Sequence, residues 1–77
     1  MAMAMAMDRK KVSSSNIRSV GYDARTRVLE VEFSSGSIVQ YERVSAETHR
    51  AMMAAPSITS FFRDRIEEEG YSSRRLR

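Results

Sequence analysis

The segment from Leu29 to Tyr41 constrains the fold more than any other part of this chain, because apolar and polar residues alternate along it on both sides of a glycine. Alternation with a period of two gives a strand one face for a core and one for water. Leu29, Val31 and Phe33 share one face, and we expect Val39 and Tyr41 to join them. The segment is therefore predicted to be a β-hairpin with Val31 opposite Val39 and Leu29 opposite Tyr41.

That register leaves a three-residue loop, Ser34-Ser35-Gly36, between the two strands. Loops of this length commonly combine a type I turn with a left-handed residue, a conformation that glycine adopts without a Cβ clash. We interpret Gly36 as a residue that the turn requires, because a single glycine among serines is a weak signal for a phosphate-binding loop.

The residues before the hairpin, 12–22, are predicted to form a third strand, and 23–27 the turn that follows it. Val20 and Tyr22 are spaced to pair with the first hairpin strand on the core face. Ile17 falls on the opposite face from Val20, which predicts a bulge near residues 18–19.

After Tyr41 the pattern changes to that of helices. Ser45 is a good N-cap, so a short helix is expected over 46–54, and Pro56 prevents its continuation. Ser57 caps a second helix, in which apolar residues recur at steps of three and four, and Gly70 is expected to end it.

These elements predict an α+β fold: a three-stranded antiparallel β-meander followed by two short helices packed on one face. The predicted core consists of Val20, Tyr22, Leu29, Val31, Phe33, Val39, Tyr41, Met52, Ile58, Phe62 and Ile66.

The length of 77 residues allows one small domain with one core. We expect residues 1–11 to be a disordered leader and 71–77 a frayed basic tail. Cysteine is absent, which excludes disulfides and thiolate-bound metals, and no apolar run reaches the roughly 20 residues needed to span a bilayer. A cytoplasmic location without membrane association is expected.

Positive charge is concentrated at the two ends of the chain. The formal net charge is +3, yet residues 12–70 carry 7 arginines against 9 acidic residues. A folded surface that grips phosphates usually has a dense basic patch, whereas basic ends give salt-sensitive and sequence-independent attraction.

No constellation of catalytic or metal-binding residues stands out. The single histidine, His49, lies within the first predicted helix, with Asp23 and Asp64 as the candidates to orient it. Glu67, Glu68 and Glu69 diverge around a helix axis and cannot all coordinate one ion. We therefore expect no enzyme activity, no metal and no cofactor.

A dispersed set of residues matches the pattern of a known family, namely Val12, Ser14, Ser15, Ile17, Gly21, Tyr22, Asp23, Leu29, Val31, Phe33, Gly36, Tyr41, Val44, Ser57, Phe61, Phe62 and Ile66. At these positions the chain resembles the KTSC family, a group of short domains found at the C-terminus of some lysyl-tRNA synthetases and as stand-alone bacterial proteins. The resemblance covers about residues 12–71 and implies a single KTSC-like domain over 12–70. The family's central Tyr-x-Tyr is reduced here to Val39-Gln40-Tyr41.

The resemblance implies RNA as a candidate partner, from the association with tRNA synthetases. Only Lys10 and Lys11 among the 13 basic residues are lysines, and arginine binds phosphate in a bidentate manner and stacks on bases. A genome rich in G and C would produce the same bias. The candidate nucleic-acid-binding residues are Arg18, Arg25, Arg27, Arg43, Arg74, Arg75 and Arg77.

The alternative hypothesis is a protein-interaction module or a homodimer. An exposed strand edge or Phe61 would form its surface, because the adjacent Phe61 and Phe62 cannot both point at one core.

Overall fold

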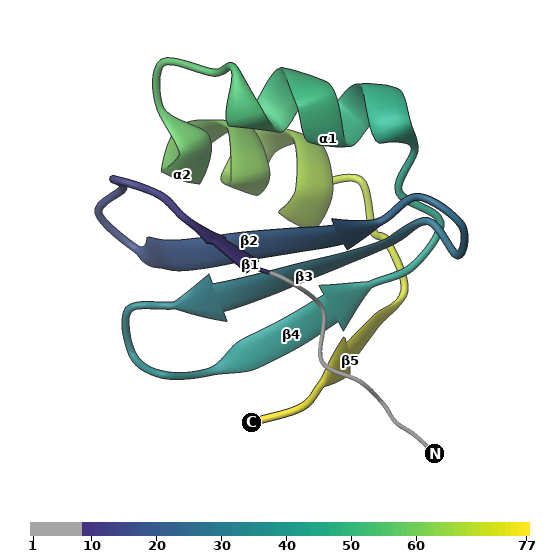
Figure 1. The fold of residues 1–77 in the computed structure, drawn as a ribbon, viewed down its shortest axis with the longest axis horizontal. Coiled ribbons are helices and arrows are strands. Elements are labelled where there is room, and N and C mark those ends of the chain that lie inside the picture. The colour runs from purple at the N-terminus through teal and green to yellow at the C-terminus, as the bar shows by residue number, and fades with distance from the viewer. Residues whose placement is uncertain (1–8) are drawn as a thin grey trace.

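The computed structural model describes residues 9–77 of the chain. Five antiparallel strands form one sheet in the order β1-β2-β3-β4-β5. The helices lie together on one face of this sheet, and β1 and β5 form its two edges (Figure 1). The α+β class and the helices packed on one face are therefore confirmed.

The elements follow one another along the chain with short connections. They are β1 (Arg9–Lys11), β2 (Ile17–Asp23), β3 (Val28–Phe33), β4 (Ile38–Tyr41), α1 (Ala46–Met53), α2 (Ile58–Phe62), the π-helical segment η1 (Arg63–Glu67) and β5 (Ser73–Arg75).

The hairpin formed by β3 and β4 has the register that its alternation predicts. Val31 lies opposite Val39, and Leu29 lies opposite Tyr41. The amide of Phe33 donates to the carbonyl of Ser37 at 2.8 Å, which closes a loop of three residues. Gly36 within this loop has a φ of 98°, a left-handed conformation that favours glycine.

Strand β2 also pairs as predicted, with Val20 opposite Val31 and Tyr22 opposite Leu29. The predicted bulge is present, because the register shifts between Ile17 and Ser19. It turns Ile17 to the core face, where the residue is only 1% exposed.

The prediction of three strands was wrong in number, because short strands also form at both ends. Residues 9–11 pair with β2 as β1, so this part of the expected disordered leader is ordered; residues 1–8 lie outside the described residues. Residues 73–75 pair with β4 as β5, so the expected frayed tail is wrong as well. Both segments are charged edge strands joined through backbone hydrogen bonds, which leave no hydrophobic pattern in the sequence.

Both helix N-caps are confirmed. The Ser45 hydroxyl accepts from the amide of Thr48 at 3.1 Å, and that of Ser57 accepts from the amide of Ser60 at 3.2 Å. The second helix changes character after Phe62, where η1 begins.

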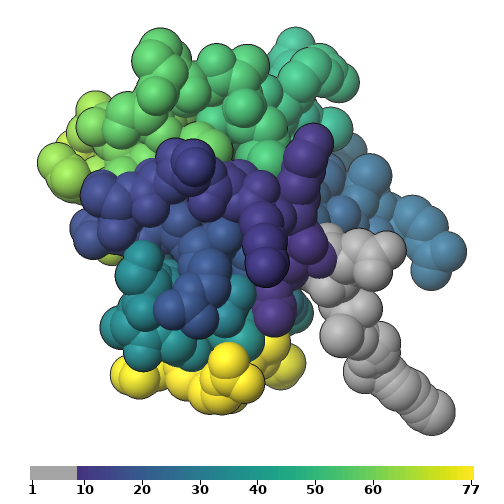
Figure 2. Space-filling view, turned by 60° about the vertical axis from the view of Figure 1, so that its left-hand side comes forward, coloured from purple at the N-terminus to yellow at the C-terminus, as the bar shows by residue number. Residues whose placement is uncertain are grey.

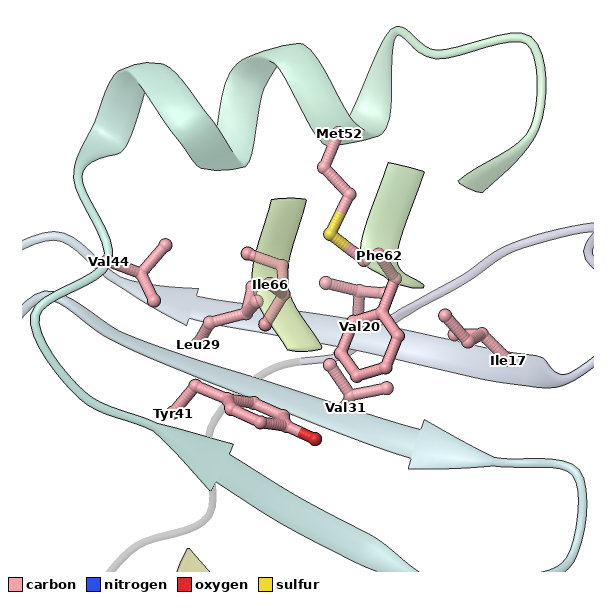
Figure 3. Close-up of a cluster of buried hydrophobic side chains, with 9 residues drawn as sticks. All are labelled: Ile17, Val20, Leu29, Val31, Tyr41, Val44, Met52, Phe62 and Ile66. Carbon is pink, nitrogen blue, oxygen red and sulfur yellow. The ribbon is translucent and has the colours of Figure 1, made fainter. Parts of the chain in front are cut away.

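The core fills the space between the sheet and the helices. Every predicted core residue is either buried or packed against the buried cluster. Ile17 and Val44 join this cluster in addition, and Figure 3 shows Phe62 reaching from α2 toward Val31 and Tyr41 of the sheet.

The face of the sheet opposite the helices carries two glutamates of β3 together with the buried Ile38 of β4, which lies opposite Glu32. Glu30 of β3 is 3% exposed; it forms an ion pair with Arg9 of β1 and accepts a hydrogen bond from Gln40 of β4 at 2.9 Å. Glu32, the next outward residue of β3, pairs with Arg18 at 3.8 Å and with Arg77 at 3.9 Å. These two glutamates connect the hairpin to both ends of the chain.

Candidate nucleic-acid interface

A groove of about 530 Å³ runs between β2 and α1. Its described lining includes the basic residues Lys10 and Arg50 and the aromatic residues Tyr22 and His49, together with apolar side chains. No acidic residue lines it within residues 9–77. In Figure 2 the helices, in green, lie against the N-terminal strands in purple and blue, while the C-terminal residues in yellow lie next to the teal strands, at the opposite edge of the sheet.

Tyr22 and His49 form a stacked aromatic pair within this groove. Their ring centroids are 4.6 Å apart, and the rings are inclined by only 11°. Tyr22 comes from the end of β2, and its hydroxyl donates to the carbonyl of Val44 just before α1. The tyrosine ring is thus anchored at both ends, and its position is set by the sheet rather than by a mobile loop.

Burial lowers the pKa of His49, and the neighbouring charge of Arg50 lowers it further. The ring is therefore neutral at pH 7. Neither Asp23 nor Asp64 hydrogen-bonds to it: the Asp23 carboxylate instead accepts from the amide of Arg25 at 2.9 Å, and Asp64 is exposed on η1. Among the described residues, the histidine and the acids considered for a hydrolytic triad are not brought together.

Three of the predicted arginines lie together at one end of the sheet. Arg25 and Arg27 belong to the turn between β2 and β3, and Arg43 follows β4. The amide of Val44 donates to the carbonyl of Arg27 at 2.9 Å, which holds these two stretches side by side. All three arginines are exposed. Ala24 and Ala46, which flank these stretches, line the groove, so the two stretches adjoin it, although the three arginines are not part of its lining.

Three other predicted arginines lie at the opposite end, around the loop between β3 and β4. Arg18 donates to the carbonyl of Ser34 at 3.2 Å, Arg75 to the hydroxyl of Ser37 at 3.3 Å, and Arg77 to the carbonyl of Gly36 at 3.3 Å. The contacts of Arg75 and Arg77 attach the C-terminal end of the chain to the hairpin. Arg74 is exposed on β5, opposite Gln40.

The structure thus divides the seven predicted arginines between two ends and adds four groove residues that the sequence interpretation missed. Tyr22 was assigned to the core alone, His49 was placed in the first predicted helix without a binding role, and Lys10 was assigned to the leader. The spacing of Lys10 and Arg50 on either side of the groove depends on the β1–β2 pairing and the packing of α1, and no local pattern predicts either.

Phe61, the predicted protein-interface residue, is partly buried and packs against the core cluster. The guanidinium of Arg65 lies 5.3 Å from the centroid of its ring, a cation–π distance. Among the large hydrophobic residues described, the exposed one is Leu76, at 48%.

Within residues 9–77, no group of three His, Cys, Asp or Glu side chains is placed to hold a metal ion. No helix in the same range has the length and apolar character required to cross a bilayer.

The fold and the sequence both match known proteins. The family model of the KTSC domain matches residues 13–71. An uncharacterized protein of Stutzerimonas stutzeri (strain A1501) is 40% identical over 65 residues, covering 84% of this chain and 92% of that protein. The crystal structure of a KTSC domain protein from Yersinia pestis has a TM-score of 0.84 at 38% identity and covers 94% of this chain and 100% of that one. These matches span the hairpin and both helices.

Proposed function

We propose that this chain, which belongs to the KTSC domain family, is a non-catalytic module that binds single-stranded nucleic acid, RNA above all. The observation that supports the proposal is the stacked Tyr22–His49 pair in a groove bordered by Lys10 and Arg50. Proteins that bind single strands combine aromatic rings, on which bases stack, with a basic groove that follows the backbone.

The charges around the groove favour an anionic chain. Lys10 and Arg50 border it, and the exposed cluster of Arg25, Arg27 and Arg43 lies beyond its mouth. None of these five side chains forms an ion pair with another described residue. A strand whose bases contact the aromatic pair would place its phosphates within reach of both groups of cations.

The open face of the sheet is a poorer candidate for the same ligand. Its centre carries the carboxylates of Glu30 and Glu32, and the arginines beside them, Arg9, Arg18 and Arg77, are already paired with these carboxylates. A phosphate approaching this face would meet negative charge and would compete for engaged guanidinium groups. We therefore assign binding to the groove and not to the sheet.

A titration of fluorescently labelled single-stranded RNA, followed by anisotropy at two salt concentrations, tests the proposal. With five phosphate contacts, affinity should fall by about a hundredfold between 50 and 200 mM salt. Arg50→Gln should reduce the slope of log K against log salt by about 0.7, the value for one lost contact to a single strand. Arg65→Gln makes the same change of charge outside the groove and should leave both quantities unchanged.

The contribution of the Tyr22–His49 pair to RNA binding is tested separately. His49→Ala removes one ring of the pair and should weaken RNA binding about tenfold at every salt concentration, because stacking is not a charge effect. Circular dichroism of the variant verifies that it is folded. RNA affinity that is equal in His49→Ala, Arg50→Gln and wild type would overturn the proposal.

Deleting the ends of the chain is not a suitable control. Residues 9–11 and 73–75 are strands of the sheet, so their removal would expose the edges of β2 and β4. Substituting Arg74, which faces solvent, by Gln tests the contribution of the C-terminal charges without removing a strand.

The alternative is a protein-interaction module or homodimer, favoured by the exposed Leu76 beside the edge strand β5. Edge strands with exposed apolar residues can pair with another chain. Analytical ultracentrifugation distinguishes the two: a dimer that dissociates in Leu76→Asp, together with absent RNA affinity, would favour this alternative.

A further inference from the structure

A second and smaller hollow, of about 250 Å³, lies at the other end of the domain, between the β3–β4 loop and η1. Apolar residues from three elements line it, namely Ile17 of β2, Phe33 of β3 and Phe62 of α2. The two phenylalanine rings meet edge to face with centroids 5.5 Å apart. This volume is below the range of about 300 to 1,000 Å³ that holds drug-sized ligands, so any occupant is small.

Two opposite charges border the same hollow. Arg63 and Glu67 both line it and both belong to η1, one turn of helix apart. They form no ion pair with each other, although residues at this spacing on a helix commonly do. Because the two side chains are not paired with each other, both charges are free to bind a ligand that carries one negative and one positive group.

Arg63 and Glu67 are the first and last residues of the π-helical segment η1. The amide of Glu68 donates to the carbonyl of Arg63 at 3.3 Å, a contact from residue i+5 to residue i that widens the helix. Single π-helical turns within helices occur frequently at functional sites. Burial first, and then the charge of the Glu67 carboxylate, raises the pKa of Tyr41 to about 12.

Thr59 of α2 adds a polar group to the same helical wall, one turn before Arg63. The hydroxyl of Thr59, which is 7% exposed, lines the hollow and is held by the hydroxyl of Ser14 and by the amide of Asn16 at 3.4 Å. The site is therefore built from segments far apart in the chain, with hydrogen bonds that fix its shape.

We propose that this hollow binds a free α-amino acid with a short apolar side chain. Arg63 would bind its carboxylate and Glu67 its ammonium group, while Ile17, Phe33 and Phe62 would contact its side chain. Carboxylate and ammonium on one carbon occur together only in the free amino acid, since a peptide terminus carries one or the other. The inference is independent of the nucleic-acid groove, which lies between β2 and α1.

Titration of the ¹⁵N-labelled protein with L-leucine, followed by two-dimensional NMR, tests this assignment. Leucine should shift the amide signals of residues 34–36 and of η1. Leucine amide lacks the carboxylate and 4-methylpentanoate lacks the amine, so each should bind at least about tenfold more weakly, the effect of one charge-assisted hydrogen bond.

Matched variants assign each charge to its partner. Arg63→Gln should weaken the binding of leucine about tenfold and leave the affinity for leucine amide unchanged. Glu67→Gln should weaken the binding of leucine by the same factor and leave the affinity for 4-methylpentanoate unchanged. Arg65→Gln and Glu69→Gln alter neighbouring residues that do not line the hollow and should have no effect.

Two outcomes would overturn the assignment. One is the absence of shifts at about 20 mM leucine, well above a Kd of ~1 mM that would correspond to weak binding. The other is equal affinity for leucine, leucine amide and 4-methylpentanoate, which would reveal an apolar hollow without charge recognition. RNA affinity is measured separately in Arg63→Gln, so failure of either proposal leaves the other standing.

Discussion

The two faces of strand β3 contain residues that alternate along the same backbone but stabilise the domain in different ways. On the inner face, Leu29 and Val31 are completely buried beneath the helices. On the outer face, Glu30 is nearly as inaccessible, at 3%, yet it is surrounded by polar partners from β1 and β4. The comparison shows that burial alone does not define the core: one face excludes water through apolar packing, and the other attaches edge strands through charge.

The inner face should be the more sensitive to truncation. Leu29→Ala leaves a cavity between the sheet and the helices, and it should lower the free energy of unfolding by about 2 to 5 kcal/mol. Val28→Ala, on the other face of the same strand and only half-buried, should cost less than about 1 kcal/mol. Urea denaturation measures both. Similar losses in the two variants would mean that the faces are not distinct.

The outer face should show a smaller and more local effect. Glu30→Ala removes the partner of Arg9 and Gln40, both of which can return to water, so we expect a loss of about 1 to 2 kcal/mol in the free energy of unfolding. Hydrogen exchange should accelerate at the amides of β1 more than at those of β4. Glu42→Ala, at an exposed position after β4, serves as the control. Uniform acceleration throughout the sheet would contradict a local role.

The smallest effect expected concerns pH. The hydrogen bond from the Ser19 hydroxyl, and then the nearby Arg9, Arg18 and Arg77, hold the pKa of Glu32 below its ordinary value of 4.5. As the pH falls below 4.5, Glu32 binds a proton more readily in the unfolded chain than in the folded one. The free energy of unfolding therefore decreases until the pH has passed the lower pKa of Glu32 in the folded state.

Thermal unfolding between pH 3 and 7 measures this contribution. Glu32→Gln lacks the titrating group and should lose less stability than wild type on acidification. Parallel pH curves for the two proteins would show that the Glu32 contacts contribute nothing to the acid sensitivity of the fold.

The candidate sites were much less predictable than the fold. Register, bulge and both caps follow from neighbouring residues, and so they could be derived from alternation and cap chemistry. The groove depends on His49 stacking against Tyr22, which is 27 positions earlier in the chain. The hollow depends on a π-helical turn, for which residues 63–67 carry no recognisable pattern.

The arginines illustrate the same limit. The composition gives the number of arginines, but not which of them form ion pairs with carboxylates. Arg18 and Arg77 are paired with Glu32, while Arg27 and Arg43 are exposed at the other end of the sheet. Availability for a ligand is set by the distance to the nearest carboxylate, which is a property of the folded chain.

The sequence by itself determined the hairpin, the core face and the two capped helices, and its dispersed motifs were sufficient to identify the KTSC domain family. Only the tertiary structure decided that the charged ends become strands β1 and β5, and that Tyr22, His49, Lys10 and Arg50 share one groove. The physical reason is the range of the interactions: side-chain periodicity and capping act over a few residues, whereas edge pairing and electrostatic contacts join residues that meet only after the core has formed.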